Sequence, residues 1–176
     1  YWFDGSFAPF CNAAHIHHLP PSVGFEAGAM TELLACCVHA VLDQAGVRAG
    51  DTVAITGPGP VGLMAAMVAK AAGGIVVMCG RSSDSARLEL ALTVGVDVVV
   101  DAEKEDAVER ICNLTDGYGA DVVVECAGSA AAIDAALDMV RRRGRYSQMG
   151  LPGVKVNVDF EKVAFKELEV TGGLGQ

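Results

Sequence analysis

The sequence predicts an α/β fold, a six-stranded, doubly wound parallel sheet with helices on both of its faces. From residue 50 onward, short β-branched apolar runs alternate with longer runs rich in Ala and Leu, and glycines stand at most of the junctions. A strand that is followed by a helix pairs with a parallel neighbour, because a parallel pair needs a crossover connection. Right-handed crossovers then place a ligand crevice at the carboxyl ends of the strands.

The predicted strands are short runs, mostly rich in Val and Ile, of the kind found in sheets that are buried on both faces. They cover residues 52–56 (TVAIT), 75–79 (IVVMC), 96–101 (VDVVVD), 121–126 (DVVVEC), 145–149 (RYSQM) and 168–171 (LEVT).

The predicted helices lie between these strands, and glycines mark where they stop. They cover residues 61–72, a segment from Ser83 or Asp84 to Gly95, residues 104–114 and residues 130–140, and residues 25–45 form a further helix before the first strand. Ser83 or Asp84 would cap the second of them. The helix over residues 130–140 stops at Gly144, which makes the arginines at 141–143 a solvated helix end. The first 24 residues have no helical period and do not fit the alternation.

Composition excludes several classes of function. The net charge is −9, with 13 Lys and Arg in 176 residues, so the chain lacks the basic stripe that a nucleic-acid partner requires. The longest uncharged run, residues 52–69, is interrupted by Gly-Pro-Gly-Pro and predicts a strand, a loop and a buried helix rather than a membrane span. Six cysteines are scattered without a Cys-x-x-Cys pair, which favours a reducing, cytoplasmic location.

A complete G-x-G-x-x-G motif (GPGPVG) begins at Gly57, between a predicted strand and a predicted helix, which is the context that makes this motif informative. We expect Gly57 to permit the tight turn, Gly59 to let the backbone approach a pyrophosphate, and Gly62 to let the helix pack closely on the strand. Pro60 and Val61, where the loop meets the helix, are also expected to bind the cofactor, because the N–H groups and partial positive charge of the helix N-terminus face the phosphates. The motif predicts a Rossmann-type dinucleotide site.

The second predicted strand ends in Gly80 and Arg81 rather than in the acidic residue that binds the ribose hydroxyls of NAD. A carboxylate at this place would repel a 2′-phosphate, whereas Gly80 leaves space and Arg81 can pair with the phosphate. Ser82 and Ser83 add hydroxyl donors. The pattern favours NADP over NAD as the cofactor, and NAD stays open because Asp84 could serve as the ribose acid if the turn folds back.

Five segments carry a family resemblance that spans nearly the whole chain. They are residues 4–8 (DGSFA), 17–20 (HHLP), 30–35 (MTELLA), 57–62 (GPGPVG) and 125–128 (ECAG). Together they resemble the medium-chain dehydrogenase/reductase superfamily, and specifically its zinc-dependent alcohol and polyol dehydrogenases, such as sorbitol and threonine dehydrogenases. Leu33 stands where the polyol branch usually has a proline.

The resemblance implies the reversible oxidation of a small alcohol or polyol, with hydride transfer to the nicotinamide and a catalytic zinc that polarises the alcohol oxygen. Glu32 matches a carboxylate that lies at the zinc site of the polyol branch, as an occasional ligand or a neighbour of the ligands. It is therefore our candidate catalytic and metal-site residue. Ala127, Gly128 and Gly150 are expected to border the cofactor crevice.

The departures from this family concern its catalytic domain. The resemblance assigns residues 1–24 to the end of a GroES-like catalytic domain and residues 25–176 to the Rossmann domain. The family's zinc-binding Cys, its Gly-His-Glu motif and its four-cysteine lobe for a structural zinc have no counterpart in this sequence. We therefore expect an excised NAD(P)-binding domain that holds no zinc and is inactive by itself, whereas the parent protein would hold zinc.

Other hypotheses remain open at this point. The chain could come from a zinc-independent quinone reductase of the same superfamily, from a non-catalytic dinucleotide sensor or, more remotely, from a methyltransferase-like protein. Glu32 argues against the first, because its carboxylate belongs to the polyol branch, and residues 1–24 argue against the second. The superfamily commonly joins two cofactor domains through a free sheet edge, so we expect a homodimer through the final strand near Val170.

Overall fold

The computed structural model describes residues 17–173. The chain separates into two compact units, Tyr1–Thr31 and Glu32–Gln176, and each unit is considered by itself. The described part of the first unit holds one short helix, α1 (Phe25–Gly28). Most of the expected GroES-like remnant lies outside the described residues, and the domain boundary between residues 24 and 25 stays a prediction.

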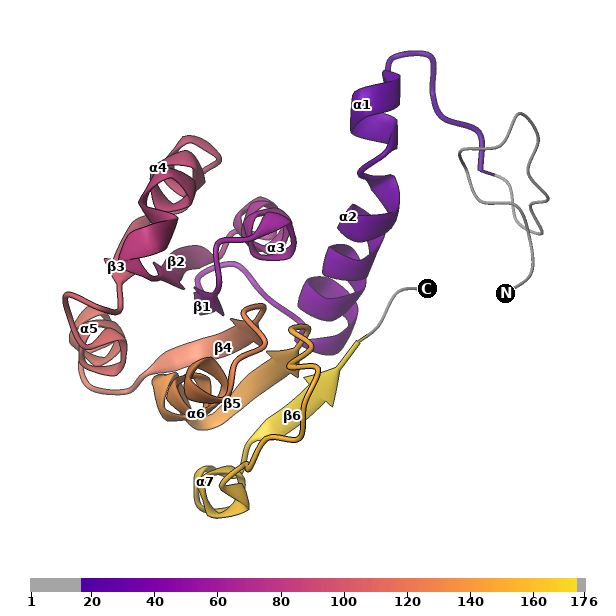
Figure 1. Cartoon of the computed structure of the whole chain (residues 1–176). Coiled ribbons are helices and arrows are strands. Elements are labelled where there is room, and N and C mark those ends of the chain that lie inside the picture. Colours follow the sequence, from indigo (N-terminus) through magenta and orange to yellow (C-terminus); the bar gives the residue numbers. More distant parts are fainter. Residues whose placement is uncertain (1–16, 174–176) are drawn as a thin grey trace. The chain divides into compact units, whose positions relative to one another are not determined.

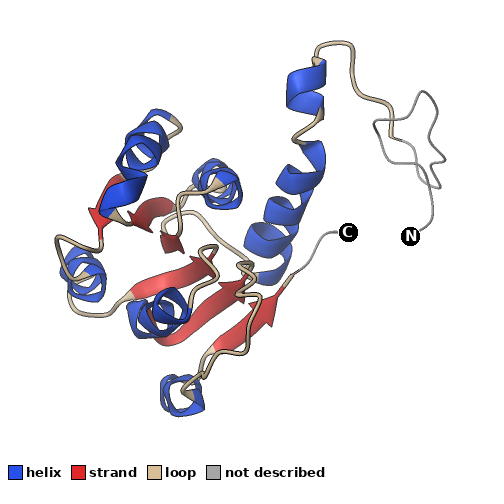
Figure 2. Ribbon diagram, in the orientation of Figure 1, coloured by secondary structure: helices blue, strands red, loops and turns tan. Residues whose placement is uncertain are grey.

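A six-stranded, all-parallel sheet forms the centre of the second unit, in the order β3-β2-β1-β4-β5-β6 (Figures 1 and 2). The order reverses between β1 and β4, which is the switch point where open sheets of this kind bind ligands. The predicted fold class is therefore confirmed. The strands are β1 (Thr52–Thr56), β2 (Ile75–Gly80), β3 (Val98–Asp101), β4 (Ala120–Glu125), β5 (Val140–Gln148) and β6 (Glu169–Gly172).

Helices cover both faces of this sheet, and Figure 1 shows α3 and α4 on one side and α5, α6 and α7 on the other. Side chains of the central strands alternate between two apolar cores: Val53 and Ile55 pack toward α3, and Ala54 packs toward α6. No helix within residues 17–173 is long and apolar enough to cross a membrane. The helices are α2 (Thr31–Val38), the π-helical η1 (His39–Gln44), α3 (Pro60–Ala71), the 3₁₀ turn η2 (Ser82–Asp84), α4 (Ser85–Thr93), α5 (Ala107–Leu114), α6 (Ala130–Met139) and α7 (Phe160–Lys166).

The structure corrects the prediction for the arginine run. α6 ends at Met139 and β5 begins at Val140, so the three arginines and the glycine that follows them lie inside a strand rather than at a helix end. Arg141 donates from Nε to Oδ1 of Asp121 at 2.7 Å, and the next two arginines both pair with Glu167. These partners are 20 to 25 residues away in the sequence, and they hold the segment extended.

Two further helical segments differ from the prediction. The region expected as one helix over residues 25–45 is divided into α1, α2 and η1. α7 is not predicted at all, and it starts where the Asp159 carboxylate accepts a hydrogen bond from the N–H of Glu161 at 2.9 Å. The ammonium of Lys166, at the end of α7, donates to the carbonyl oxygens of Leu137, Asp138 and Val140. α7 therefore satisfies the carbonyls at the point where α6 passes directly into β5.

Candidate cofactor site

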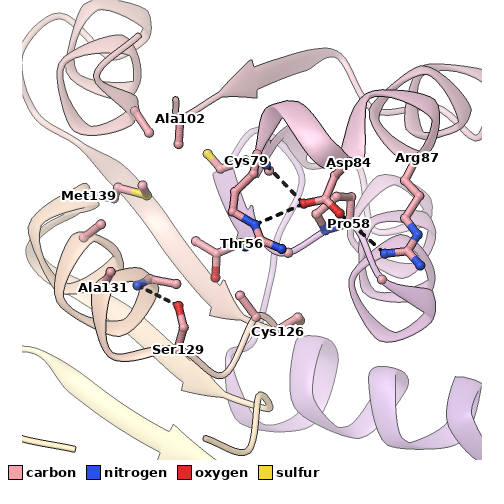
Figure 3. Close-up of a pocket in the computed structure, with 18 residues that line it drawn as sticks. Thr56, Pro58, Cys79, Asp84, Arg87, Ala102, Cys126, Ser129, Ala131 and Met139 are labelled. Carbon is pink, nitrogen blue, oxygen red and sulfur yellow. Dashed lines mark hydrogen bonds and ion pairs between the residues drawn. The ribbon is translucent and has the colours of Figure 1, made fainter. Parts of the chain in front are cut away.

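A pocket of about 470 Å³ opens at the carboxyl ends of β1, β2 and β4, beside the switch point of the sheet (Figure 3). Its walls come from the turns after these three strands and after β3, from the start of α4 and from one face of α6. Figure 3 shows Asp84 and Arg87 on one side of it and Ser129 and Ala131 on the other. Its volume lies in the range of sites that hold cofactors and drug-sized ligands. Five of the predicted cofactor residues line it, namely Gly57, Gly59, Gly80, Arg81 and Ala127.

The glycine loop has the geometry that its motif requires. Gly57 adopts a φ of 85°, in the left-handed region that favours glycine. Gly59 is the N-cap of α3, and Pro60 follows in its first turn, where a missing N–H leaves no helical bond unmade. A Cβ on Gly62 would lie 2.0 Å from the carbonyl oxygen of Gly57, whereas a Cβ on Gly59 would meet nothing within 4 Å. The protein itself therefore requires glycine at 62, and Gly59 leaves open space for a ligand. Val61, like Pro60 and Gly62, is not among the residues that line the pocket.

The space beside Gly80 is partly filled by the loop. A Cβ on Gly80 would lie 2.9 Å from Cγ of Pro58 and 3.2 Å from Cδ2 of Leu88. The Pro58 ring thus occupies the place that the side chain of an acidic residue at the end of β2 would need. Gly80 is required by this close approach, and only part of the space expected for a 2′-phosphate is open there.

Two arginines flank one carboxylate at the mouth of the pocket. Asp84 accepts a hydrogen bond from the backbone N–H of Arg81 at 3.2 Å, which closes the η2 turn. Its carboxylate also lies 3.7 Å from Nε of Arg81 and 3.5 Å from Nη1 of Arg87. The Asp84 side chain is 15% exposed, whereas those of Arg81 and Arg87 are 70% and 60% exposed. The cluster carries one net positive charge if all three groups are ionised, which suits an anionic ligand. Sequence reasoning missed Arg87.

Ser82 is held at the edge of the sheet rather than in the pocket. Its hydroxyl donates to Oδ2 of Asp101 at 2.8 Å, and it is not among the pocket-lining residues. Hydrogen bonds from Lys104 and then from Ser82 hold the pKa of the Asp101 carboxyl below its usual value. Ser82 therefore already has an acceptor, and it would have to exchange that bond to reach a phosphate.

The predicted residues Gly128 and Gly150 do not line the pocket, and they lie where the turns after β4 and β5 touch each other. Gly128 has a φ of 67°, and a Cβ on Gly150 would lie 2.4 Å from the amide nitrogen of Gly128. The same Cβ would lie 2.5 Å from Oε2 of Glu125, the last residue of β4. Sequence reasoning gave Glu125 no role, although an acid that directly follows three strand valines (VVVE) was a usable signal.

Glu32 lies in the first turn of α2 and accepts a hydrogen bond from the Cys36 thiol at 3.2 Å. Within residues 17–173, no group of three or more His, Cys, Asp or Glu side chains could hold a metal ion. Cys11 and His15 lie outside that part of the chain. The role of Glu32 at a zinc site, and the expectation that this chain holds no zinc, both stay predictions.

The chain is similar to curated dehydrogenases over almost its entire length. It is 46% identical to a sorbitol dehydrogenase from Halalkalibacterium halodurans and 39% identical to an L-threonine 3-dehydrogenase from Pyrococcus abyssi, and each match covers 98% of the chain. These matches cover 51% and 50% of the two relatives. The chain thus spans about half the length of the curated relatives that it matches.

Solved structures agree with this result. An alcohol dehydrogenase from Thermus sp. ATN1 superposes with a TM-score of 0.82 and 34% identity, over 90% of this chain and 46% of the other. A Sinorhizobium meliloti 1021 protein, solved with NADP bound, superposes with a TM-score of 0.77 and 35% identity, over 85% of this chain and 44% of the other. The family model described as zinc-binding dehydrogenase matches residues 60–176, from the start of α3 onward. The parallel sheet, the glycine loop at its switch point and this match agree, and the chain belongs to the zinc-binding dehydrogenase family.

Proposed function

We propose that this chain is the NAD(P)-binding part of a zinc-dependent alcohol or polyol dehydrogenase and that its cofactor is NADP. The observation that carries the proposal is the glycine loop at the start of α3, which lines a pocket at the switch point of the sheet. The similarity to sorbitol, threonine and alcohol dehydrogenases supports it, and so does a relative that was solved with NADP.

The residues of the pocket fit the parts of such a dinucleotide. The pyrophosphate would approach the backbone at Gly59, where unpaired N–H groups of the first turn of α3 are available. Arg81 and Arg87 would pair with the 2′-phosphate, and they would leave Asp84 when they do so. An apolar wall on α6, which includes Ala131, would face the adenine ring.

The parent protein would oxidise a small alcohol or polyol and pass the hydride to the nicotinamide, with zinc supplying the polarisation of the alcohol oxygen. Glu32 is proposed to lie near that zinc. We further propose a homodimer, because within the described residues β6 has a strand neighbour on one side only and Val170 is 49% exposed. A cytoplasmic location is consistent with the free thiols of Cys37, Cys79 and Cys126.

Fluorescence titration of the chain with NADPH and with NADH tests the function. We expect both to bind and NADPH to bind more tightly. Gly59→Val is the matched control, because a Cβ at this position would meet no protein atom within 4 Å, and the added side chain would obstruct a pyrophosphate at this backbone. Equal affinities for the two cofactors would refute the 2′-phosphate assignment. Binding of neither, or binding that the Gly59→Val variant retains, would overturn the site itself.

A further inference from the structure

Glu125 is the one fully buried charged side chain of the described residues, and it stands at the carboxyl end of a central strand. Its carboxylate accepts hydrogen bonds from the Thr56 hydroxyl at 3.1 Å, from the N–H groups of Ala127 and Gly128 at 2.9 Å each, and from the side-chain amide of Gln148. Every one of these donors is neutral. A buried carboxylate is tolerated only when such bonds are complete, so this cluster is under tight geometric constraint.

The donors of Glu125 come from three segments: the end of β1, the turn after β4 and the end of β5. The turns that follow these strands stack in backbone contact. A Cβ on Gly57 would lie 2.8 Å from Cα of Ala127, and a Cβ on Gly128 would lie 2.9 Å from the carbonyl oxygen of Leu151. Gly57 thus packs against the backbone and methyl group of Ala127, and Gly128 packs against the backbone of Leu151. The turn after β4 lies between the other two, so its position sets both the position of the glycine loop and that of the turn after β5.

Gln148 is itself oriented for this role. Its amide nitrogen donates to Glu125 and to the carbonyl oxygen of Gly150, the latter at 2.7 Å, and its amide oxygen accepts the hydroxyl of Tyr146. Burial, and then the nearby Glu125 carboxylate, raise the pKa of the Tyr146 hydroxyl well above its usual value, so it remains an O–H donor. The amide of Gln148 thus presents its N–H groups, and not its oxygen, to the carboxylate.

We propose that Glu125 is the positioning residue of the cofactor crevice: its carboxylate fixes the turn after β4 between the glycine loop and the turn after β5. It does not line the pocket and acts through Ala127 and Gly128. The inference rests on the proposed function, because it assigns a role toward a dinucleotide bound in this pocket.

The test is an exchange of the two side chains. Glu125→Gln replaces one acceptor oxygen by an NH₂ group, which must face the N–H groups of Gln148 or of Gly128. We expect NADPH affinity to fall about tenfold, the scale of one lost charge-assisted hydrogen bond. Gln148→Glu should also weaken binding, because it sets two carboxylates against each other. Glu125→Gln combined with Gln148→Glu restores one carboxylate and one amide, so it should recover part of the affinity lost by Gln148→Glu; the recovery is partial because the Gly150 carbonyl has lost its donor.

Amide hydrogen exchange gives a second readout. Exchange of the Ala127 and Gly128 amides should quicken at least about fivefold in Glu125→Gln and slow again in the double variant. Asp121→Asn is the stability control, because Asp121 pairs with Arg141 and lies at the opposite ends of the strands. That variant should lower the unfolding midpoint and leave NADPH affinity unchanged.

The outcomes separate the two claims. If the unchanged chain binds no dinucleotide, the proposed function fails. If the unchanged chain binds NADPH and folded Glu125→Gln binds it equally well, or if the double variant binds no better than Gln148→Glu, Glu125 does not position the site. If Glu125→Gln does not fold, Gln148→Met takes its place, because it removes the link to β5 without burying a second charge. Unchanged NADPH affinity in that variant would overturn the inference.

Discussion

The contact between Pro58 and Gly80 predicts that an acid cannot simply be introduced at the end of β2 to convert the site to NAD. A Cβ on Gly80 would lie 2.9 Å from Cγ and 3.0 Å from Cδ of Pro58. Carbon atoms in good contact are about 3.5–4.0 Å apart, so the overlap is about 0.6 Å or more. The ring is fixed to the backbone and cannot rotate away. Gly80→Asp should therefore cost about 1–3 kcal/mol of unfolding free energy, the usual cost of overpacking.

Pro58→Ala removes both overlapping atoms and should relieve this cost. By itself it should cost only about 0.4–1 kcal/mol, through the greater freedom of the unfolded chain. The double variant Pro58→Ala/Gly80→Asp should then be more stable than the sum of the two single changes by about 1–2 kcal/mol. It should also bind NADH more tightly than the unchanged chain does, because its carboxylate can accept the ribose hydroxyls.

Urea unfolding of the four proteins measures the coupling, and NADH and NADPH titrations measure the change of cofactor preference. Gly80→Ala, with and without Pro58→Ala, isolates the effect of the Cβ from that of the charge. The reasoning is refuted if Gly80→Asp unfolds at the same urea concentration as the unchanged chain, or if it binds NADH as tightly as the double variant does.

Four further changes probe the charge cluster, the sheet and its edge. Arg81→Ala should weaken NADPH binding by about 1 kcal/mol, at the low end for a charged hydrogen bond because the Arg81 side chain is 70% exposed, and it should leave NADH binding unchanged. Asp84→Asn keeps an acceptor for the turn and should instead tighten NADPH binding. Titrations that show no change in either variant would contradict the role of the cluster. Burial raises the pKa of Asp97, but hydrogen bonds from Lys70 and from the Val76 N–H outweigh it and hold the pKa in the folded protein below the usual 3.8. The stability that the ionised Asp97 contributes is therefore complete above pH 3.8, and it is lost as the pH falls through the pKa of the folded state. Asp97→Asn should therefore flatten the loss of unfolding free energy as the pH falls below about 4 in urea titrations, and an unchanged slope there would contradict this. The Gly173 N–H donates to the carbonyl oxygen of Gln148 in β5, and successive N–H groups of a strand point to opposite sides, so the Val170 N–H points away from β5. Val170→Pro should therefore leave the fold intact and shift a dimer toward monomer in sedimentation. A native chain that sediments as a monomer at micromolar concentration would refute the edge contact.

The sequence by itself determined the layers of the sheet and the location of the glycine loop. Both depend on patterns that are local: valine-rich runs that must be buried on two faces, and glycines whose backbone geometry other residues resist. The strand over residues 52–56 was predicted with its observed bounds, and the helix that follows the loop was predicted to within one residue at each end. The glycine at 62 was assigned to close packing of the helix on the strand, and its close contact is with Gly57, the residue that directly follows that strand.

Only the tertiary structure decided the features that depend on partners far away in the sequence. The arginine run has the local character of a helix end, but Asp121 and Glu167 hold it in β5. Gly80 has the local character of an open space, but the loop after β1 brings Pro58 against it. Glu125 is an ordinary acid in the sequence, and it becomes a buried link because β1, β5 and its own turn each direct a donor at it. Hydrogen bonds and steric contacts between strands fix these positions, and a local pattern contains neither.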